Sequence, residues 1–156
     1  MKQSRRDLLK ASGGVTVMAL AASAGMLKSG NLHAQEWNKA AFDTKGLQDT
    51  VKALGGTTAT ESKDITITSP DIAENGAVVP VSVTSRLGKT ETISILVEKN
   101  PNALSAAFDI PGGTEPFVST RVKMGQTSNV HALVKADGKY FYATKEIKVT
   151  LGGCGG

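Results

Sequence analysis

Along most of the chain, apolar and polar residues alternate in short runs, a pattern typical of strands with one buried face. In the segment DITIT (64–68), for example, isoleucine occupies every second position. Turn residues separate seven such runs: 64–68, 78–84, 91–98, 104–110, 117–124, 128–136 and 139–151. Their number, length and spacing predict an all-β fold, an immunoglobulin-like antiparallel β-sandwich.

Individual residues refine this strand prediction. Asp137-Gly138 separates the last two runs, and this dipeptide favours a two-residue hairpin turn. Asn75-Gly76 predicts a second turn of the same type, type I′. Pro80 predicts that the run 78–84 lies at a sheet edge or contains a bulge, because proline has no N–H to donate to a neighbouring strand. An edge strand is in turn a candidate surface for a protein partner.

The segment before these runs has a helical pattern. Trp37, Ala41, Leu47 and Val51 are separated by three- or four-residue steps or their multiples, which predicts a helix over residues 36–54. The glycine pair 55–56 is expected to end it.

The first 34 residues have the layout of an export signal, with a basic start, an apolar run rich in small residues and a polar end. The segment SRRDLLK (4–10) resembles a twin-arginine signal in which Arg5 and Arg6 are the paired arginines. We expect cleavage after Ala34 and a periplasmic protein that is exported already folded. The apolar run is broken by glycine and serine, so no stable membrane anchor is expected. Residues 35–151 would then form the single folded domain.

The charge of this domain differs from that of the whole chain. The sequence has 18 basic and 14 acidic residues and a net charge of +4. The first 34 residues hold five of the basic residues and one of the acidic ones, which leaves 13 of each. A neutral domain gives no reason to expect nucleic-acid binding.

The chain ends in GGCGG, and Cys154 is its only cysteine. Gly152, Gly153, Gly155 and Gly156 flank it, which predicts a thin, mobile C-terminal arm that directly continues the last strand. An unpaired cysteine in an exported protein indicates either a reactive thiol or a disulfide to another chain. We expect a thiol that is carried into the narrow active site of another protein, which requires no cofactor or metal in the carrier.

Two other interpretations of Cys154 are weighed against this one. A catalytic thiol of its own would need a neighbouring base or cation, and the arm offers none. The domain has one histidine, His131, which the strand pattern marks as a half-buried structural residue. A permanent intermolecular disulfide in a structural or assembly module stays open as the alternative.

The chain resembles the SoxY family, the sulfur-carrying subunits of the SoxYZ complex in bacterial thiosulfate oxidation. The resemblance covers nearly the whole chain and rests on the twin-arginine signal and four further motifs. These are AENGAVVPV (73–81), EKNPN (98–102), STRVKM (119–124) and the terminal GGCGG.

The resemblance implies that Cys154 is the covalent attachment point for sulfur intermediates and that the surrounding glycines form the carrier arm. It implies a heterodimer with a SoxZ-like subunit. It also implies that a c-type cytochrome loads the thiosulfate, a hydrolase releases sulfate, and a dehydrogenase oxidises the remaining sulfane sulfur. The carrier itself would catalyse nothing.

Overall fold

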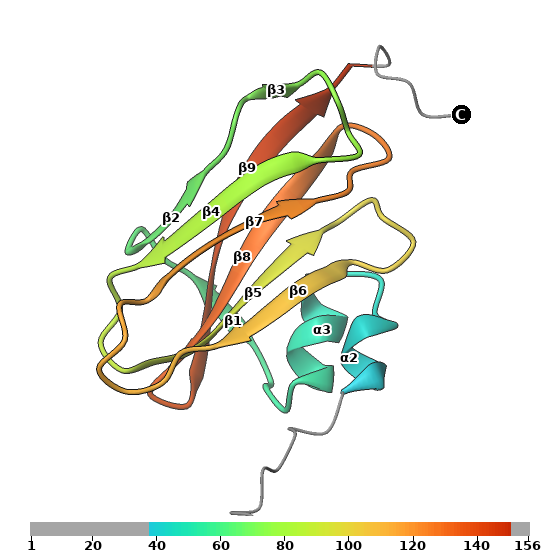
Figure 1. The fold of residues 1–156 in the computed structure, drawn as a ribbon. Helices are drawn as coiled ribbons and strands as arrows, with labels where there is room; N and C mark the ends of the chain where they lie inside the picture. Colours follow the sequence, from blue (N-terminus) through green and yellow to red (C-terminus); the bar gives the residue numbers. More distant parts are fainter. Residues whose placement is uncertain (1–37, 151–156) are drawn as a thin grey trace, which may run out of the picture. The chain divides into compact units, whose positions relative to one another are not determined.

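The computed structural model describes residues 38–150, which form a two-sheet β-sandwich with two short helices (Figure 1). The helices are α2 (Lys39–Phe42) and α3 (Leu47–Ala53). The strands are β1 (Ala59–Glu61), β2 (Ile65–Thr68), β3 (Ile72–Ala73), β4 (Val79–Ser85), β5 (Thr90–Val97), β6 (Leu104–Asp109), β7 (Phe117–Val122), β8 (Ser128–Ala136) and β9 (Lys139–Val149). The predicted all-β sandwich is confirmed, and each of the seven predicted runs matches one of the longer strands, with β4 and β5 extending one residue beyond theirs.

The larger sheet has the order β1-β9-β8-β5-β6, and β3 also pairs with β9. The smaller sheet has the order β2-β4-β7. All pairings are antiparallel except those of β1 and β3, which run parallel to β9. The sequence did not predict β1 and β3, because three and two residues are too few to show an alternating pattern.

The core lies between the two sheets and follows the predicted alternation. On β4, β5 and β8, apolar residues at alternating positions are fully or almost fully buried. The side chains concerned are Val79, Val81, Val83, Ile93, Ile95, Val97, Val130, Ala132, Val134 and Ala136. Because β-branched side chains pack well on a pleated surface, the same residues favour the strand and fill the core.

The predicted single helix over 36–54 is wrong, because the described part of this segment forms two helices separated by residues 43–46. The break is held by a contact from far along the chain, since the Ala103 N–H donates to the Thr44 carbonyl at 2.8 Å. The Thr44 hydroxyl donates to the Ala41 carbonyl at 2.7 Å and lies 2.6 Å from the Thr50 hydroxyl. The Thr44 carbonyl is thus used by Ala103, just before β6, rather than by an N–H of a continuing helix.

The glycine pair ends α3 as predicted. Gly55 has a φ of 86°, and the Gly56 N–H donates to the Val51 carbonyl at 2.8 Å, which is the Schellman arrangement. A side chain at Gly56 would meet the Tyr140 ring at 2.6 Å. The helices can therefore pack closely against one part of the larger sheet, in a second cluster with Leu96, Leu104, Leu133 and Tyr140.

The hairpin prediction is confirmed, since Asp137 and Gly138 have φ values of 49° and 72°. The type I′ turn predicted at Asn75-Gly76 is wrong, because neither residue has a positive φ. The Asn75 side chain instead accepts a hydrogen bond from the Ala77 N–H at 2.9 Å, which is a local turn that needs no left-handed residue.

The edge position predicted for the strand containing Pro80 is also wrong, since β4 lies between β2 and β7. The last pair between β2 and β4 on this side is Thr68 with Ser82, so Pro80 has no partner on β2. Pro80 faces Arg121 of β7 on one side only. A central strand tolerates proline at this position, because no backbone N–H is needed on the side that faces β2.

Candidate functional site

The predicted site residues all lie outside the described residues 38–150. These are Cys154, the arm glycines Gly152, Gly153, Gly155 and Gly156, and the signal arginines Arg5 and Arg6. What the structure describes is the place where the C-terminal segment leaves the domain. We call this place the arm root and define it as residues 148–150 with their contacts.

At the arm root, three consecutive backbone N–H groups each have a partner. Lys148 donates to the Asp71 carbonyl at 2.9 Å, Val149 to the Thr127 hydroxyl at 3.0 Å, and Thr150 to the Ala73 carbonyl at 3.1 Å. β3 and the loop between β7 and β8 therefore hold the end of β9 from two sides (Figure 1). The domain thus presents the C-terminal segment from a fixed point.

The loop between β3 and β4 packs directly on this root. The Met124 N–H donates to the Gly76 carbonyl at 2.7 Å. A side chain on Gly76 would collide with the Met124 carbonyl oxygen and would lie 2.9 Å from a methyl of Val149. Gly76 is therefore needed because its backbone lies close to Met124 and Val149, and not because it has a positive φ.

Polar contacts tie the neighbouring loops to the same end of the domain. The Asn100 side chain donates to the Lys123 carbonyl at 2.7 Å and so joins the β5–β6 loop to the β7–β8 loop. The Lys145 ammonium donates to the Ser69 carbonyl at 2.6 Å and lies 3.0 Å from the Asp71 carboxylate. The two contacts of Lys145 hold the segment that leads into β3 against β9.

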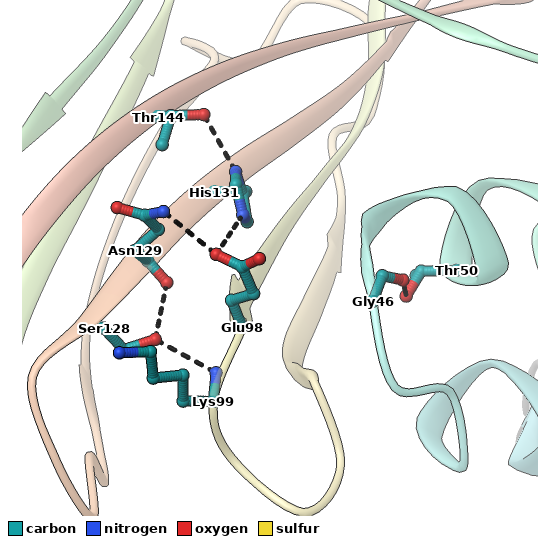
Figure 2. A network of polar contacts seen from close by, with 8 residues as sticks. All are labelled: Gly46, Thr50, Glu98, Lys99, Ser128, Asn129, His131 and Thr144. Atoms are coloured by element: carbon teal, nitrogen blue, oxygen red, sulfur yellow. Dashed lines mark hydrogen bonds and ion pairs between the residues drawn. The ribbon is translucent and has the colours of Figure 1, made fainter.

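His131 belongs to a separate polar network on the outer face of the larger sheet (Figure 2). Its Nδ1 lies 2.8 Å from the Thr144 hydroxyl, and its Nε2 lies 3.6 Å from the Glu98 carboxylate. Asn129 donates to the same carboxylate at 3.0 Å. The side chain of His131 is 11% exposed, so it is more deeply buried than the half-buried position predicted for it.

The two ring nitrogens of His131 both have partners inside the domain. The Thr144 hydroxyl lies beside Nδ1 and the Glu98 carboxylate beside Nε2. These contacts fit a structural role for His131 and give no support to a role as the base for Cys154.

Burial lowers the pKa of His131 below its ordinary value of 6.5, and the nearby Glu98 carboxylate opposes this only in part. A pKa that is lower in the folded state means that the unfolded chain takes up the proton first as the pH falls. The contribution of the neutral His131 to folding stability is therefore fully present above pH 6.5 and decreases as the pH falls below that value.

We therefore expect the thermal unfolding midpoint of the protein to decrease when the pH is lowered from about 7 to about 5.5. The decrease should be smaller in the variant His131→Gln. The measurement is thermal unfolding by circular dichroism across this range. Glu91, whose pKa is lowered from 4.5 by Lys135, contributes only at lower pH. An identical pH dependence in both proteins would contradict the assignment.

Within residues 38–150, no group of three or more histidine and acidic side chains could hold a metal ion. In the same part of the chain, every helix is too short to span a bilayer. The sequence missed the root residues Asp71, Ala73 and Thr127, because their role depends on backbone contacts between distant segments. The sequence could have indicated a role for Gly76, since it lies inside the AENGAVVPV motif. It was instead predicted to be part of a turn.

Comparison with known proteins identifies a protein family and similar solved structures. The family model described as sulfur oxidation protein SoxY matches residues 51–154, a range that includes Cys154. The structure of the sulfur carrier protein SoxY from Chlorobium limicola f thiosulfatophilum is 38% identical, with a TM-score of 0.63. The match covers 72% of this chain and 99% of that one.

A superoxide reductase (neelaredoxin) from Ignicoccus hospitalis is a more distant match, at 21% identity and a TM-score of 0.48. It covers 55% of this chain and 80% of that one, and so low a score carries no argument about function. No curated protein matches the chain.

Proposed function

Because the chain belongs to the SoxY family of sulfur carriers, which are not catalysts, we propose that it holds sulfur intermediates of thiosulfate oxidation covalently on Cys154. The family match that extends through Cys154 carries this proposal. The arm root supports it, because a carrier needs its reactive group on a short tether that starts from a firm base.

The proposed loading step joins the sulfur of Cys154 to the sulfane sulfur of thiosulfate. One S–S bond forms, the thiol loses its proton, and two electrons leave to a c-type cytochrome. The product is a cysteine S-thiosulfonate. Disulfide-type bonds of this kind form and break readily at an accessible thiol.

The proposed release step is hydrolysis of the terminal sulfonate. Water attacks the sulfone sulfur, the S–S bond to the sulfonate breaks, and sulfate leaves together with two protons. A cysteine persulfide remains on Cys154. A dehydrogenase would oxidise that sulfane sulfur, and a second hydrolysis would free the thiol.

These partners act in turn on one carrier. We propose that the chain forms a heterodimer with a SoxZ-like subunit and works in the periplasm after export through the signal that contains Arg5 and Arg6. A covalent intermediate on the carrier keeps reactive sulfur from being lost to solvent between enzymes.

Intact-mass spectrometry of protein from cells grown with and without thiosulfate tests this function. A carrier is expected to show added mass on Cys154 only with thiosulfate, and a reducing agent should remove it. The alternative is a structural module that uses Cys154 for a permanent disulfide to another chain. That module would show one fixed disulfide in both cultures, and this result would overturn the proposal.

The glycines next to Cys154 give a second test. Gly153→Val is expected to leave the unfolding midpoint unchanged but to slow loading of Cys154 by the cytochrome by at least about tenfold, because the wider, stiffer chain fits a narrow channel poorly. Stopped-flow measurement of cytochrome reduction by thiosulfate and the carrier gives this rate. Loading of the variant at the wild-type rate would show that the slenderness of the arm is irrelevant.

A further inference from the structure

Exposed apolar side chains gather next to the arm root. Within residues 38–150, three large hydrophobic side chains are strongly exposed: Ile72 at 56%, Val78 at 51% and Phe117 at 49%. Ile72 and Val78 stand at the two ends of the loop that packs on β9. Exposed Pro70 precedes Ile72 by two residues, and exposed Pro80 follows Val78 by two. We call Pro70, Ile72, Val78 and Pro80 the root patch.

Backbone contacts place the root patch beside the last residues of β9. Ile72 pairs with Lys148 in the parallel β3–β9 ladder. Val78 is two residues from Gly76, where an added Cβ would lie 2.9 Å from a methyl of Val149. Figure 1 shows β3, the start of β4 and the end of β9 at the same end of the domain.

The surroundings of the root patch are polar. Asp71 and Lys145 form their ion pair beside Ile72, and the exposed Lys148 is its direct strand partner. An apolar centre with a charged rim is the usual composition of a protein–protein contact surface. Single exposed apolar residues are common, whereas groups of exposed apolar residues mark interaction sites.

We propose that the root patch is the surface on which the enzymes that act on Cys154 dock. This inference rests on the proposed carrier function and adds to it the contact that brings carrier and enzyme together. The occupant is thus a catalytic protein with an apolar rim around the channel that receives the arm.

The short distance between the arm root and Cys154 favours an enzyme as the occupant of the root patch. Cys154 stands four residues beyond Thr150, so its backbone is never more than about 14 Å from the arm root. An enzyme that takes the thiol into a channel must therefore approach to within that distance, and the root patch is the apolar surface that it then meets. A permanent subunit on the patch would occupy the same space and would obstruct the approach.

The test uses the full-length carrier with its SoxZ-like subunit, loaded with thiosulfonate on Cys154, as the substrate of the sulfate-releasing hydrolase. The variants are Ile72→Ser, Val78→Ser and the double variant, and the measurements are KM and kcat for sulfate release. Phe117→Ser is the matched control. It removes a similarly exposed side chain opposite Thr84, at the other end of β4 from Val79.

We expect the double variant to raise KM by about tenfold with little change in kcat. The lost contact would stabilise the bound ground state and the transition state equally, so its loss weakens binding without slowing the chemical step. Each single variant should have a smaller effect, and Phe117→Ser should leave KM within about twofold. Retention of the wild-type unfolding midpoint and of normal alkylation of Cys154 by iodoacetamide would show that fold and thiol are intact.

Two results would overturn the docking proposal. An unchanged KM in the double variant would mean that the enzymes do not use this surface. Loss of the SoxZ-like subunit, or of self-association, in the double variant would assign the patch to a subunit interface instead. Failure of the carrier function is a separate outcome, since wild-type Cys154 would then take up no thiosulfate group at all.

Discussion

Replacing Cys154 by serine is expected to abolish thiosulfate oxidation that depends on this protein. Serine keeps the size and polarity of the side chain but offers no sulfur for an S–S bond, so no intermediate can be attached. In a reconstituted system with the partner enzymes, the thiosulfate-dependent rate of cytochrome reduction should fall to that measured without any carrier. The unfolding midpoint of the domain should not change, because the domain core is built entirely from other residues.

The matched control is Ser69→Ala, which removes a hydroxyl near the arm root and leaves Cys154 in place. The Ser69 hydroxyl is buried and has no hydrogen-bond partner, so its removal should cost little stability. This variant should support wild-type rates. Residual turnover in Cys154→Ser above the level without carrier would contradict the assignment of Cys154 as the attachment point.

Replacing Gly76 by alanine is expected to destabilise the domain by about 2–3 kcal/mol and to lower its Tm by roughly 10 °C. The added methyl group would collide with the carbonyl oxygen of Met124 and lie 2.9 Å from a methyl of Val149. The backbone cannot yield without losing the bond from the Met124 N–H to the Gly76 carbonyl. Thermal unfolding measures the loss.

The damage from Gly76→Ala should be greatest at the arm root. We expect the amide hydrogens of Val149 and Thr150 to exchange faster in the variant, because the loop that packs on them is displaced. Gly125→Ala is the control, since a side chain there would have no heavy atom within 4 Å. Equal unfolding midpoints for the two variants would show that the close approach at Gly76 is unimportant.

The described domain and the segment after it have separate roles in the proposed carrier. The sandwich provides a base whose last strand is held through Asp71, Ala73 and Thr127. The proposed attachment point, Cys154, belongs to the segment that follows. Cys154 stands only four residues beyond Thr150, so in this proposal the enzymes come to the carrier and meet the surface beside the arm root.

The sequence by itself determined the fold class, the hairpin at Asp137-Gly138, the end of α3 at Gly55, and the choice of Cys154 as the candidate site. Each of these depends on local chemistry: an alternating pattern, a residue that tolerates positive φ, or an unusual composition. The export signal and the arm were likewise inferred from composition, and they stay predictions, since they lie outside the described residues.

Only the tertiary structure decided the break in the helix at Thr44, the central place of β4 and the reason for Gly76. In each case the deciding partner is remote in sequence: Ala103 for Thr44, β2 and β7 for β4, and Met124 with Val149 for Gly76. Local patterns report which face a residue prefers and which backbone angles it tolerates. They do not report which distant carbonyl or strand will be next to it, and those contacts determine the arm root.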